Sequence, residues 1–149
     1  MKKEENGIFI GSFSSNNKKD VTIGTFKGKN SYSVFVYTNE GNNIDHFHIV
    51  PNDGVSKVIC VQIKKAVYFP HGTKTGKLNS RDCTALDTFL RSANTSEEGS
   101  KYKFTNWQFI FYIWLVAHED IIAGNEKHIE MLKSYAQPNY TTIADYNKR

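Results

Sequence analysis

Polar and apolar residues alternate strictly in one short stretch, residues 46–49. His46 and His48 alternate there with Phe47 and Ile49. In an extended chain successive side chains point to opposite faces, so both imidazoles share one face and both large apolar side chains share the other. The pattern predicts a strand that buries Phe47 and Ile49 in a core and carries the two histidines on its other face.

Other β-type segments lie on both sides of this strand. They are rich in β-branched and aromatic residues and are separated by turn-forming Gly, Asn and Asp. The predicted strands cover residues 8–10, 21–26, 32–38 and 58–63. Because the links between them are short, they favour an antiparallel meander, and the continuous apolar run of residues 58–63 indicates a strand buried on both faces.

In the second half of the chain the spacing of apolar residues changes from two to about 3.6. This spacing predicts a helix over residues 80–92, with Asn79 or Ser80 as its N-cap, and another over residues 126–136. Between them, residues 94–99 are polar and show no periodicity, which predicts a loop.

A further predicted helix, residues 107–117, is apolar almost all round. Thr105 and Gln108 stand at capping-box spacing and mark its start. Because Gln108 is its only strongly polar residue, a sheet can cover just one side of it. We expect the other side to be covered by the helix of residues 126–136, or by a second copy of the chain in a homo-oligomer.

Together these elements predict an α+β fold: a curled antiparallel sheet of four or five strands, followed by two or three helices packed on one face. At 149 residues the chain is expected to form one domain. We expect it to be β-rich over residues 7–70, helical over residues 80–136 and to end in a polar tail over residues 137–149. It contains no internal repeat and no linker long enough to divide it.

Composition favours a reduced protein in the cytoplasm. The two cysteines, Cys60 and Cys83, stand in apolar surroundings typical of small buried thiols. The first apolar stretch is too short for a signal peptide, and no apolar run approaches membrane-spanning length. We therefore expect a cytoplasmic protein with no membrane partner.

The net charge of +4 arises in the β-rich half, because residues 1–75 contain ten lysines and six acidic residues, whereas residues 76–149 contain nine of each sign. Lysines beside a sheet with exposed aromatic rings are typical of single-strand nucleic-acid binding. The candidates are Lys18, Lys19, Lys27 and Lys29, with Tyr32 or Tyr37 stacking on bases. Alternatively, these lysines protect solvated hairpin loops and sheet edges.

His71 follows the strand of residues 58–63, which an antiparallel meander returns alongside the histidine strand. We therefore expect His46, His48 and His71 to share one surface patch. Two imidazoles on one strand face can reach a single metal ion, with His71 and either Asp45 or Asp53 as further ligands. The alternative is structural: histidines half-buried on a sheet face and hydrogen-bonded to backbone or to an acidic side chain.

Motifs for catalysis are lacking. No serine or cysteine stands in a nucleophile motif, and the glycines at 72 and 76 are too close together for a phosphate-binding loop. His46 and His48 alternate with apolar residues as in the histidine-triad nucleotide hydrolases, but Ile44 occupies the first of the three histidine positions. We therefore expect no cofactor and leave open whether the protein is an enzyme.

Three motifs occur together: Tyr-Phe-x-His-Gly at residues 68–72, Leu-Asn-Ser at 78–80 and Thr-Asn-Trp at 105–107. In this combination the chain resembles, over about residues 35–119, a group of small uncharacterised proteins of gut bacteria and their phages and mobile elements. Residues 44–49 are more weakly similar to a bacterial domain of unknown function, found in toxin-antitoxin-like operons, that has a Pro-Pro-His-x-His-Val strand.

These resemblances imply a small non-enzymatic accessory protein of phage or mobile-element type. Such a protein would act by binding a host protein or nucleic acid. The alternative function is that of a metal-dependent or toxin-like enzyme that uses His46, His48 and His71.

Overall fold

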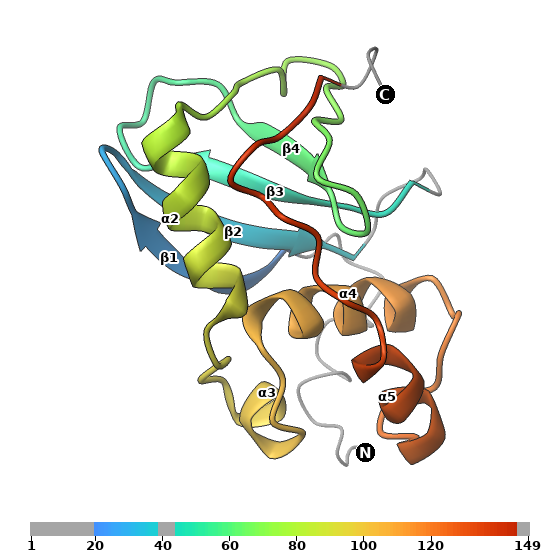
Figure 1. Cartoon of the computed structure of the whole chain (residues 1–149). Coiled ribbons are helices and arrows are strands. Elements are labelled where there is room, and N and C mark those ends of the chain that lie inside the picture. Colours follow the sequence, from blue (N-terminus) through green and yellow to red (C-terminus); the bar gives the residue numbers. More distant parts are fainter. Residues whose placement is uncertain (1–19, 39–43, 146–149) are drawn as a thin grey trace.

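The structure is a computed structural model that describes residues 20–38 and 44–145. Within these residues the chain forms an α+β fold of four strands and four helices (Figure 1). The strands are β1 (Asp20–Lys27), β2 (Ser31–Tyr37), β3 (His46–Pro51) and β4 (Ile59–Gln62), and the helices are α2 (Ser80–Arg91), α3 (Glu97–Lys101), α4 (Asn106–Ala117) and α5 (Glu126–Lys133). The fold class predicted from the sequence is confirmed. The strand predicted at residues 8–10 lies outside the described residues.

The sheet has the strand order β1-β2-β3-β4, and each neighbouring pair is antiparallel. This is the meander expected from the short links between the predicted strands. In the register, Val34 lies opposite Ile49, and Phe47 lies opposite Val61. Because residues directly opposite each other project on the same side of a sheet, these four apolar side chains form one face.

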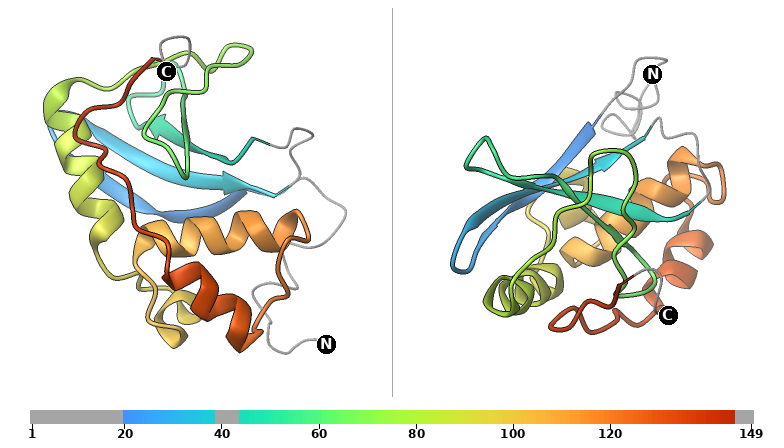
Figure 2. Two further views of the ribbon diagram at one scale, coloured as in Figure 1. Left: turned by 45° about the vertical axis from the view of Figure 1, so that its right-hand side comes forward. Right: turned by 90° about the horizontal axis from the view of Figure 1, so that it is seen from above.

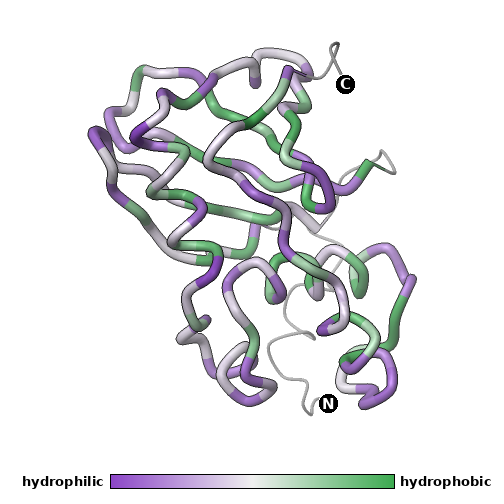
Figure 3. The backbone as a smooth tube through the Cα atoms, viewed as in Figure 1, coloured by the Kyte–Doolittle hydropathy of each residue, from purple (hydrophilic) through white to green (hydrophobic). Residues whose placement is uncertain are grey.

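That apolar face is the core of the molecule. Helices α2 and α4 pack against it, so the helices cover the face that carries Phe47 and Ile49 (Figure 1). The fully buried core side chains include Val34, Val36, Phe47, Ile49, Leu86, Leu90, Trp107, Ile110 and Ile113. Figure 3 shows the hydrophobic stretches gathered on the central strands and α4. Phe89 of α2 is half-buried at the edge of this cluster.

Helix α4 begins as its sequence predicted. The side chain of Thr105 accepts a hydrogen bond from the backbone N–H of Gln108, and the Gln108 side chain accepts one from the backbone N–H of Thr105. On the side away from the sheet, α5 contributes Ile129 and Leu132 to the core. Helix α5 therefore covers the far side of α4. A homo-oligomer through α4 stays a prediction.

The hairpin turn between β1 and β2 is attached to the first turn of α2 through one buried carboxylate. Asp82 Oδ1 accepts hydrogen bonds from the backbone N–H groups of Lys29 (2.6 Å) and Asn30 (3.2 Å), and Tyr32 donates its hydroxyl to Oδ2 (2.5 Å). Burial by itself raises the pKa of Asp82, but these hydrogen bonds outweigh it and hold the pKa below its usual value. A Cβ at Gly28 would stand 2.5 Å from this carboxylate, so the turn requires glycine there.

One helix was missed in the polar segment of residues 94–99, which was wrongly predicted to be a loop throughout. Helix α3 begins within it, and Ser96 caps the helix by accepting a hydrogen bond from Gly99 N–H (3.0 Å). Its length of five residues is too short to produce a visible period. The signal that was available is a serine followed by two acidic residues, which favour a helix N-terminus.

The described part of the predicted polar tail is docked on the body of the protein. Figure 2 shows this segment rising from α5 past the sheet. Tyr140 is fully buried, and its hydroxyl donates to the carbonyl of Ile63 (2.6 Å). Further along, Ala144 N–H donates to the carbonyl of Ala66 (3.0 Å). The polar composition of this segment gave no sign that Tyr140 attaches it to the core.

Residues 66–76 fold back along β4 and cover its outer edge. Gln62 N–H donates to the carbonyl of Val67 (2.9 Å), and Phe69 N–H donates to the carbonyl of Cys60 (2.8 Å). Beyond Phe69 the chain makes a tight turn in which His71 and Lys74 exchange backbone hydrogen bonds. Gly72 within this turn has a positive φ of 57°, a conformation that suits glycine. The turn fixes the place from which the His71 side chain projects.

Candidate metal centre

The second face of the sheet carries the histidines. His46 and His48 project from β3 on the side opposite Phe47, as their alternation predicted. Both side chains are buried, each with 1% of its surface exposed. The expectation of a surface patch is therefore wrong for these two residues, because neighbouring rings and the segment of residues 66–76 close over them.

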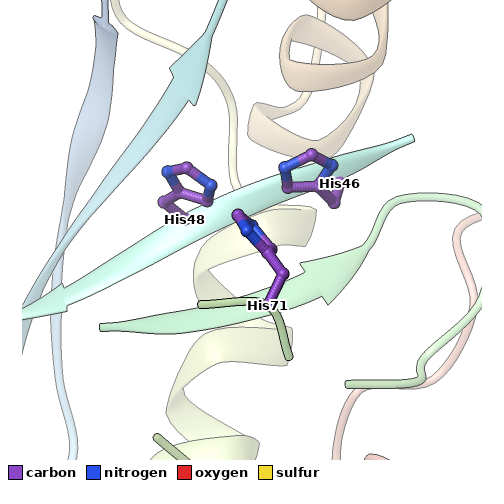
Figure 4. Close-up of side chains that lie close together, drawn as sticks. All are labelled: His46, His48 and His71. Atoms are coloured by element: carbon purple, nitrogen blue, oxygen red, sulfur yellow. The ribbon is translucent and has the colours of Figure 1, made fainter. Parts of the chain in front are cut away.

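His71 reaches the same place from the turn beyond Phe69, and Figure 4 shows its ring pointing between the rings of His46 and His48. Its ring centroid lies 5.3 Å from that of His46 and 5.9 Å from that of His48. One ring nitrogen of each histidine lies within 4.8 Å of the other two. The predicted meeting of the three histidines is confirmed.

The hydrogen bond made by His46 determines which nitrogen faces the cluster. Its Nδ1 lies 2.7 Å from the carbonyl oxygen of Ile44. A carbonyl can only accept, so Nδ1 carries the proton and Nε2 presents a lone pair. A hydrogen bond to backbone is what the structural alternative predicted for these histidines. Metal-binding histidines usually make the same bond with the ring nitrogen that does not bind the metal.

Aromatic rings from three parts of the chain surround the cluster. Tyr37 of β2 meets the ring of His48 edge-on at 4.1 Å. Phe69 lies 5.0 Å from the ring of His46, and Trp114 of α4 lies 5.3 Å from it. These walls exclude water and lower the local dielectric constant, so electrostatic and coordinate interactions within the cluster are strengthened.

Two residues of β4 share the histidine face because they stand opposite the histidines in the register. Cys60 lies opposite His48, and Gln62 lies opposite His46. Cys60 Sγ is 3.4 Å from His71 Nε2. Gln62 Oε1 is buried and accepts no hydrogen bond from the described residues. The face therefore offers a thiol and an amide oxygen beside the three imidazoles.

The donor set fits a transition-metal ion. Imidazole nitrogens bind zinc at about 2.0–2.1 Å, which places two ligand nitrogens of a tetrahedral site about 3.3 Å apart. The three nitrogens lie within 4.8 Å of one another, and side-chain rotation can close the remaining difference. Imidazole suits zinc, copper, iron and nickel, whereas magnesium and calcium require oxygen ligands.

Asp45, the fourth candidate from the sequence, is not brought into the cluster. Its carboxylate accepts a hydrogen bond from Lys64 N–H (2.8 Å), and its backbone carbonyl accepts one from Ile63 N–H (3.2 Å). Asp45 therefore braces the turn after β4. Among the described residues, the group that can share one ion comprises His46, His48 and His71.

The fold places two of the residues predicted to bind nucleic acid, Lys29 and Tyr32, in the lining of one pocket, but it gives neither predicted tyrosine a fully exposed ring. Tyr32 is buried, stacks on Phe26 at 5.0 Å and binds Asp82, so it has no free face for a base. Burial and the bond to Asp82 raise the pKa of Tyr32 to about 12. Tyr37 is half-buried against His48. Lys27 and Lys29 are exposed, whereas Lys18 and Lys19 lie outside the described residues.

A separate pocket of about 630 Å³ opens where β2 begins and β3 ends. Its lining includes Lys29, Lys57 and Lys77. Lys77 pairs with Asp145 at 2.5 Å, and the carboxylate of Asp53 is engaged by the backbone of its own turn. The lysines make this pocket a second place where a ligand can bind, distinct from the histidine cluster.

The residues that the sequence did not single out are Cys60 and Gln62. They alternate within a strand that was correctly predicted, which was a signal that they share a face. Their position opposite His48 and His46 depends on the register of β3 and β4, which the sequence pattern left open.

Comparison with known proteins gives no match: no protein family, curated protein or solved structure matches this chain. The interpretation of the histidine cluster therefore depends on its own geometry. No helix among the described residues is long and apolar enough to cross a bilayer.

Proposed function

We propose that this protein binds one divalent transition-metal ion through His46, His48 and His71. The observation that carries this proposal is that nitrogens from three imidazoles, on two separate segments of the chain, lie within 4.8 Å of one another. Two of these imidazoles are almost completely buried.

Physical chemistry supports this function over simple packing. Burying polar side chains costs free energy unless each is satisfied, and apolar residues of similar size would fill the same space without that cost. A bound ion uses the lone pairs of all three rings at once. The bond from His46 to the Ile44 carbonyl orients one of these lone pairs before any ion arrives.

The experiment is a calorimetric titration of tag-free protein with Zn²⁺ in a buffer that does not chelate metal. We expect one ion per chain. The variants His46→Gln, His48→Gln and His71→Gln each remove a ligand. Loss of a residue that only hydrogen-bonds a ligand weakens metal binding about 10- to 100-fold, and each of these variants should weaken zinc binding by more than that.

The matched control is His128→Gln, which makes the same chemical change in α5. His128 Nδ1 accepts a hydrogen bond from Ile122 N–H and lies outside the histidine cluster. This variant should bind zinc like the wild type. Absence of binding to the wild type, or equal binding by wild type and the three cluster variants, would overturn the proposal.

A second candidate function is binding of single-stranded nucleic acid, as the lysines and tyrosines of the β-rich half predicted. The observation that favours it is the pocket at the start of β2 and the end of β3, which has three lysines in its lining. Backbone phosphates are attracted by such a group, and the affinity then falls steeply with salt. Binding to a host protein stays a prediction from the sequence.

Fluorescence polarisation with labelled single-stranded RNA and DNA tests this second candidate. The double variant Lys29→Ala, Lys57→Ala should lose binding at low salt, whereas the charge-matched double variant Lys101→Ala, Lys127→Ala should keep it. If the two double variants bind equally, the pocket is not the binding site. If the wild type does not bind at low salt, this candidate function is excluded.

A further inference from the structure

We propose that Cys60 is the fourth protein ligand of this ion, bound as a thiolate, so that the site is closed. This inference rests on the proposed metal-binding function of His46, His48 and His71. It goes beyond that function because it assigns the last coordination position and, with it, the role of the ion.

The first support is distance. Cys60 Sγ lies 3.4 Å from His71 Nε2. Zinc binds sulfur at about 2.3 Å and nitrogen at about 2.0–2.1 Å, so a sulfur and a nitrogen of one tetrahedral zinc lie about 3.5 Å apart. Cys60 and His71 therefore stand at the separation that two ligands of one ion require. Cys60 is not among the side chains whose ligand atoms all lie within 4.8 Å of one another, so binding requires its side chain or the histidines to rotate toward a common centre.

The second support is the sheet register. Cys60 stands directly opposite His48 on the neighbouring strand, so the two side chains project from the same face. His71 arrives from the segment that covers the edge of β4, and Phe69 N–H in that segment donates to the carbonyl of Cys60 (2.8 Å). Backbone hydrogen bonds thus hold three ligands from β3, β4 and the turn at fixed positions.

The third support is enclosure. Cys60, His46 and His48 each have 1% of their surface exposed. Rings of Tyr37 and Phe69 lie against the histidines. A catalytic zinc keeps a position open for water or substrate, whereas structural zinc has four protein ligands. Three of the four ligands are thus almost completely enclosed, and His71 is half-buried. A site with three imidazoles and one thiolate has the four protein ligands of the second kind.

Metal binding by the Cys60 thiol requires neither an oxidant nor a reductant. The thiol proton of Cys60 passes to solvent as the metal–sulfur bond forms, and the oxidation states of the metal and sulfur do not change. Mixed nitrogen and sulfur ligands select zinc or cobalt(II) over magnesium, calcium and manganese. The ion then ties β3, β4 and the turn of His71 together and does not activate a substrate.

Cobalt(II) replaces zinc as the probe in the experiment, because a cobalt–thiolate bond absorbs in the near ultraviolet whereas tetrahedral coordination itself gives strong visible bands. Reduced, tag-free protein is titrated with CoCl₂, and wild type is compared with Cys60→Ser and Cys83→Ser. Cys83 is the matched control, since it is the other buried free cysteine of the described residues.

We expect both sets of bands in the wild type and in Cys83→Ser. In Cys60→Ser the near-ultraviolet band should be lost and the affinity should fall about tenfold or more. Should Cys60→Ser fail to fold, the wild type and Cys83→Ser spectra still decide the result. Zinc absorption-edge spectroscopy provides a second readout, with a sulfur neighbour at about 2.3 Å.

The outcomes that overturn the inference are distinct from each other. Visible bands in the wild type without the near-ultraviolet band would remove Cys60 as a ligand and leave metal binding by the histidines in place. An oxygen ligand, such as a water held by Gln62 Oε1, would then occupy the fourth position. Absence of all bands would overturn the metal-binding function together with this inference.

Discussion

The two faces of β3 are equally buried over residues 46–49 but chemically different. On one face Phe47 and Ile49 pack against α2 and α4 in an apolar core. On the other face His46 and His48, from the same strand, meet polar and sulfur-containing side chains. Folding requires the first face, since burial of apolar surface drives it. Buried polar side chains on the second face do not add to this driving force, and the proposed metal ion would give them a role.

The contrast is informative because both faces share one backbone. Residues of β3 alternate between the core and the histidine cluster, so any movement of the strand displaces side chains on both faces. A change on the core face should lower stability under all conditions. A change on the histidine face should matter mainly when a metal ion is present. Four predictions test this contrast, from the largest expected effect to the smallest.

Replacing Phe47 by Ala should have the largest effect. Its side chain is fully buried, and a Phe→Ala change in a core costs about 3–5 kcal/mol because it leaves a cavity. Urea unfolding of metal-free protein measures the loss. The control is Phe35→Ala, the same change at a half-exposed position opposite His48, which should cost clearly less. Equal losses would erase the distinction between the two faces.

Replacing His48 by Gln should remove the stability that an ion adds. Free zinc at about 100 times its dissociation constant stabilises the folded wild type by about 2.7 kcal/mol. In the variant, addition of zinc should leave the melting temperature almost unchanged. Thermal unfolding with zinc and with a chelator provides the comparison, and His128→Gln should respond to zinc like the wild type. A full zinc response in His48→Gln would contradict a site on this face.

Replacing Asp82 by Asn should lower stability by about 2 kcal/mol at neutral pH, since the buried carboxylate loses charge-assisted hydrogen bonds from Lys29, Asn30 and Tyr32. The folded-state pKa of Asp82 is lowered, so its contribution is complete above the unfolded value of about 3.9 and is lost as the pH falls through the folded value. The difference between wild type and variant should therefore shrink below about pH 4.

Urea midpoints of both proteins between neutral pH and about pH 3, with chelator present, measure this dependence. Because Asp82 lies on the core side of the sheet, zinc should not alter the difference at neutral pH. A difference that stays constant on acidification would show that the Asp82 charge does not stabilise the hairpin turn.

Replacing Thr105 by Ala should have the smallest effect. The N-cap bond to Gln108 N–H is lost, which costs about 1 kcal/mol. Since α4 packs on the core face, we expect the same loss in zinc and in chelator. Chemical unfolding under the two conditions tests this. A loss that depends strongly on zinc would link α4 to the histidine cluster, for example through Trp114 beside His46.

Local patterns predicted much of this structure. The alternation of residues 46–49 separates the two faces, and the capping box of Thr105 and Gln108 marks the start of α4. Both depend on neighbours in the sequence, which is why they could be read from it. The meeting of His71 with the strand histidines also followed, because short links constrain a meander.

Features that depend on distant contacts could not be predicted in this way. The burial of Tyr32 follows from Asp82, which is fifty residues away in sequence. The anchoring of Tyr140 depends on carbonyl oxygens of β4 and of the residue after it. Cys60 joins the histidines through a register that no local pattern determines. Each needs a partner whose position is set only when the chain is folded.

The segment that carries His71 also covers the outer edge of β4. An uncovered edge strand offers its unpaired backbone groups to other chains, and this is a common start of aggregation. An ion that holds His71 would also hold this cover in place. Loss of metal would leave this cover held by its backbone hydrogen bonds alone, so the β4 edge would open more often while the apolar core stays folded. The first sign of an empty histidine cluster would then be a less soluble protein.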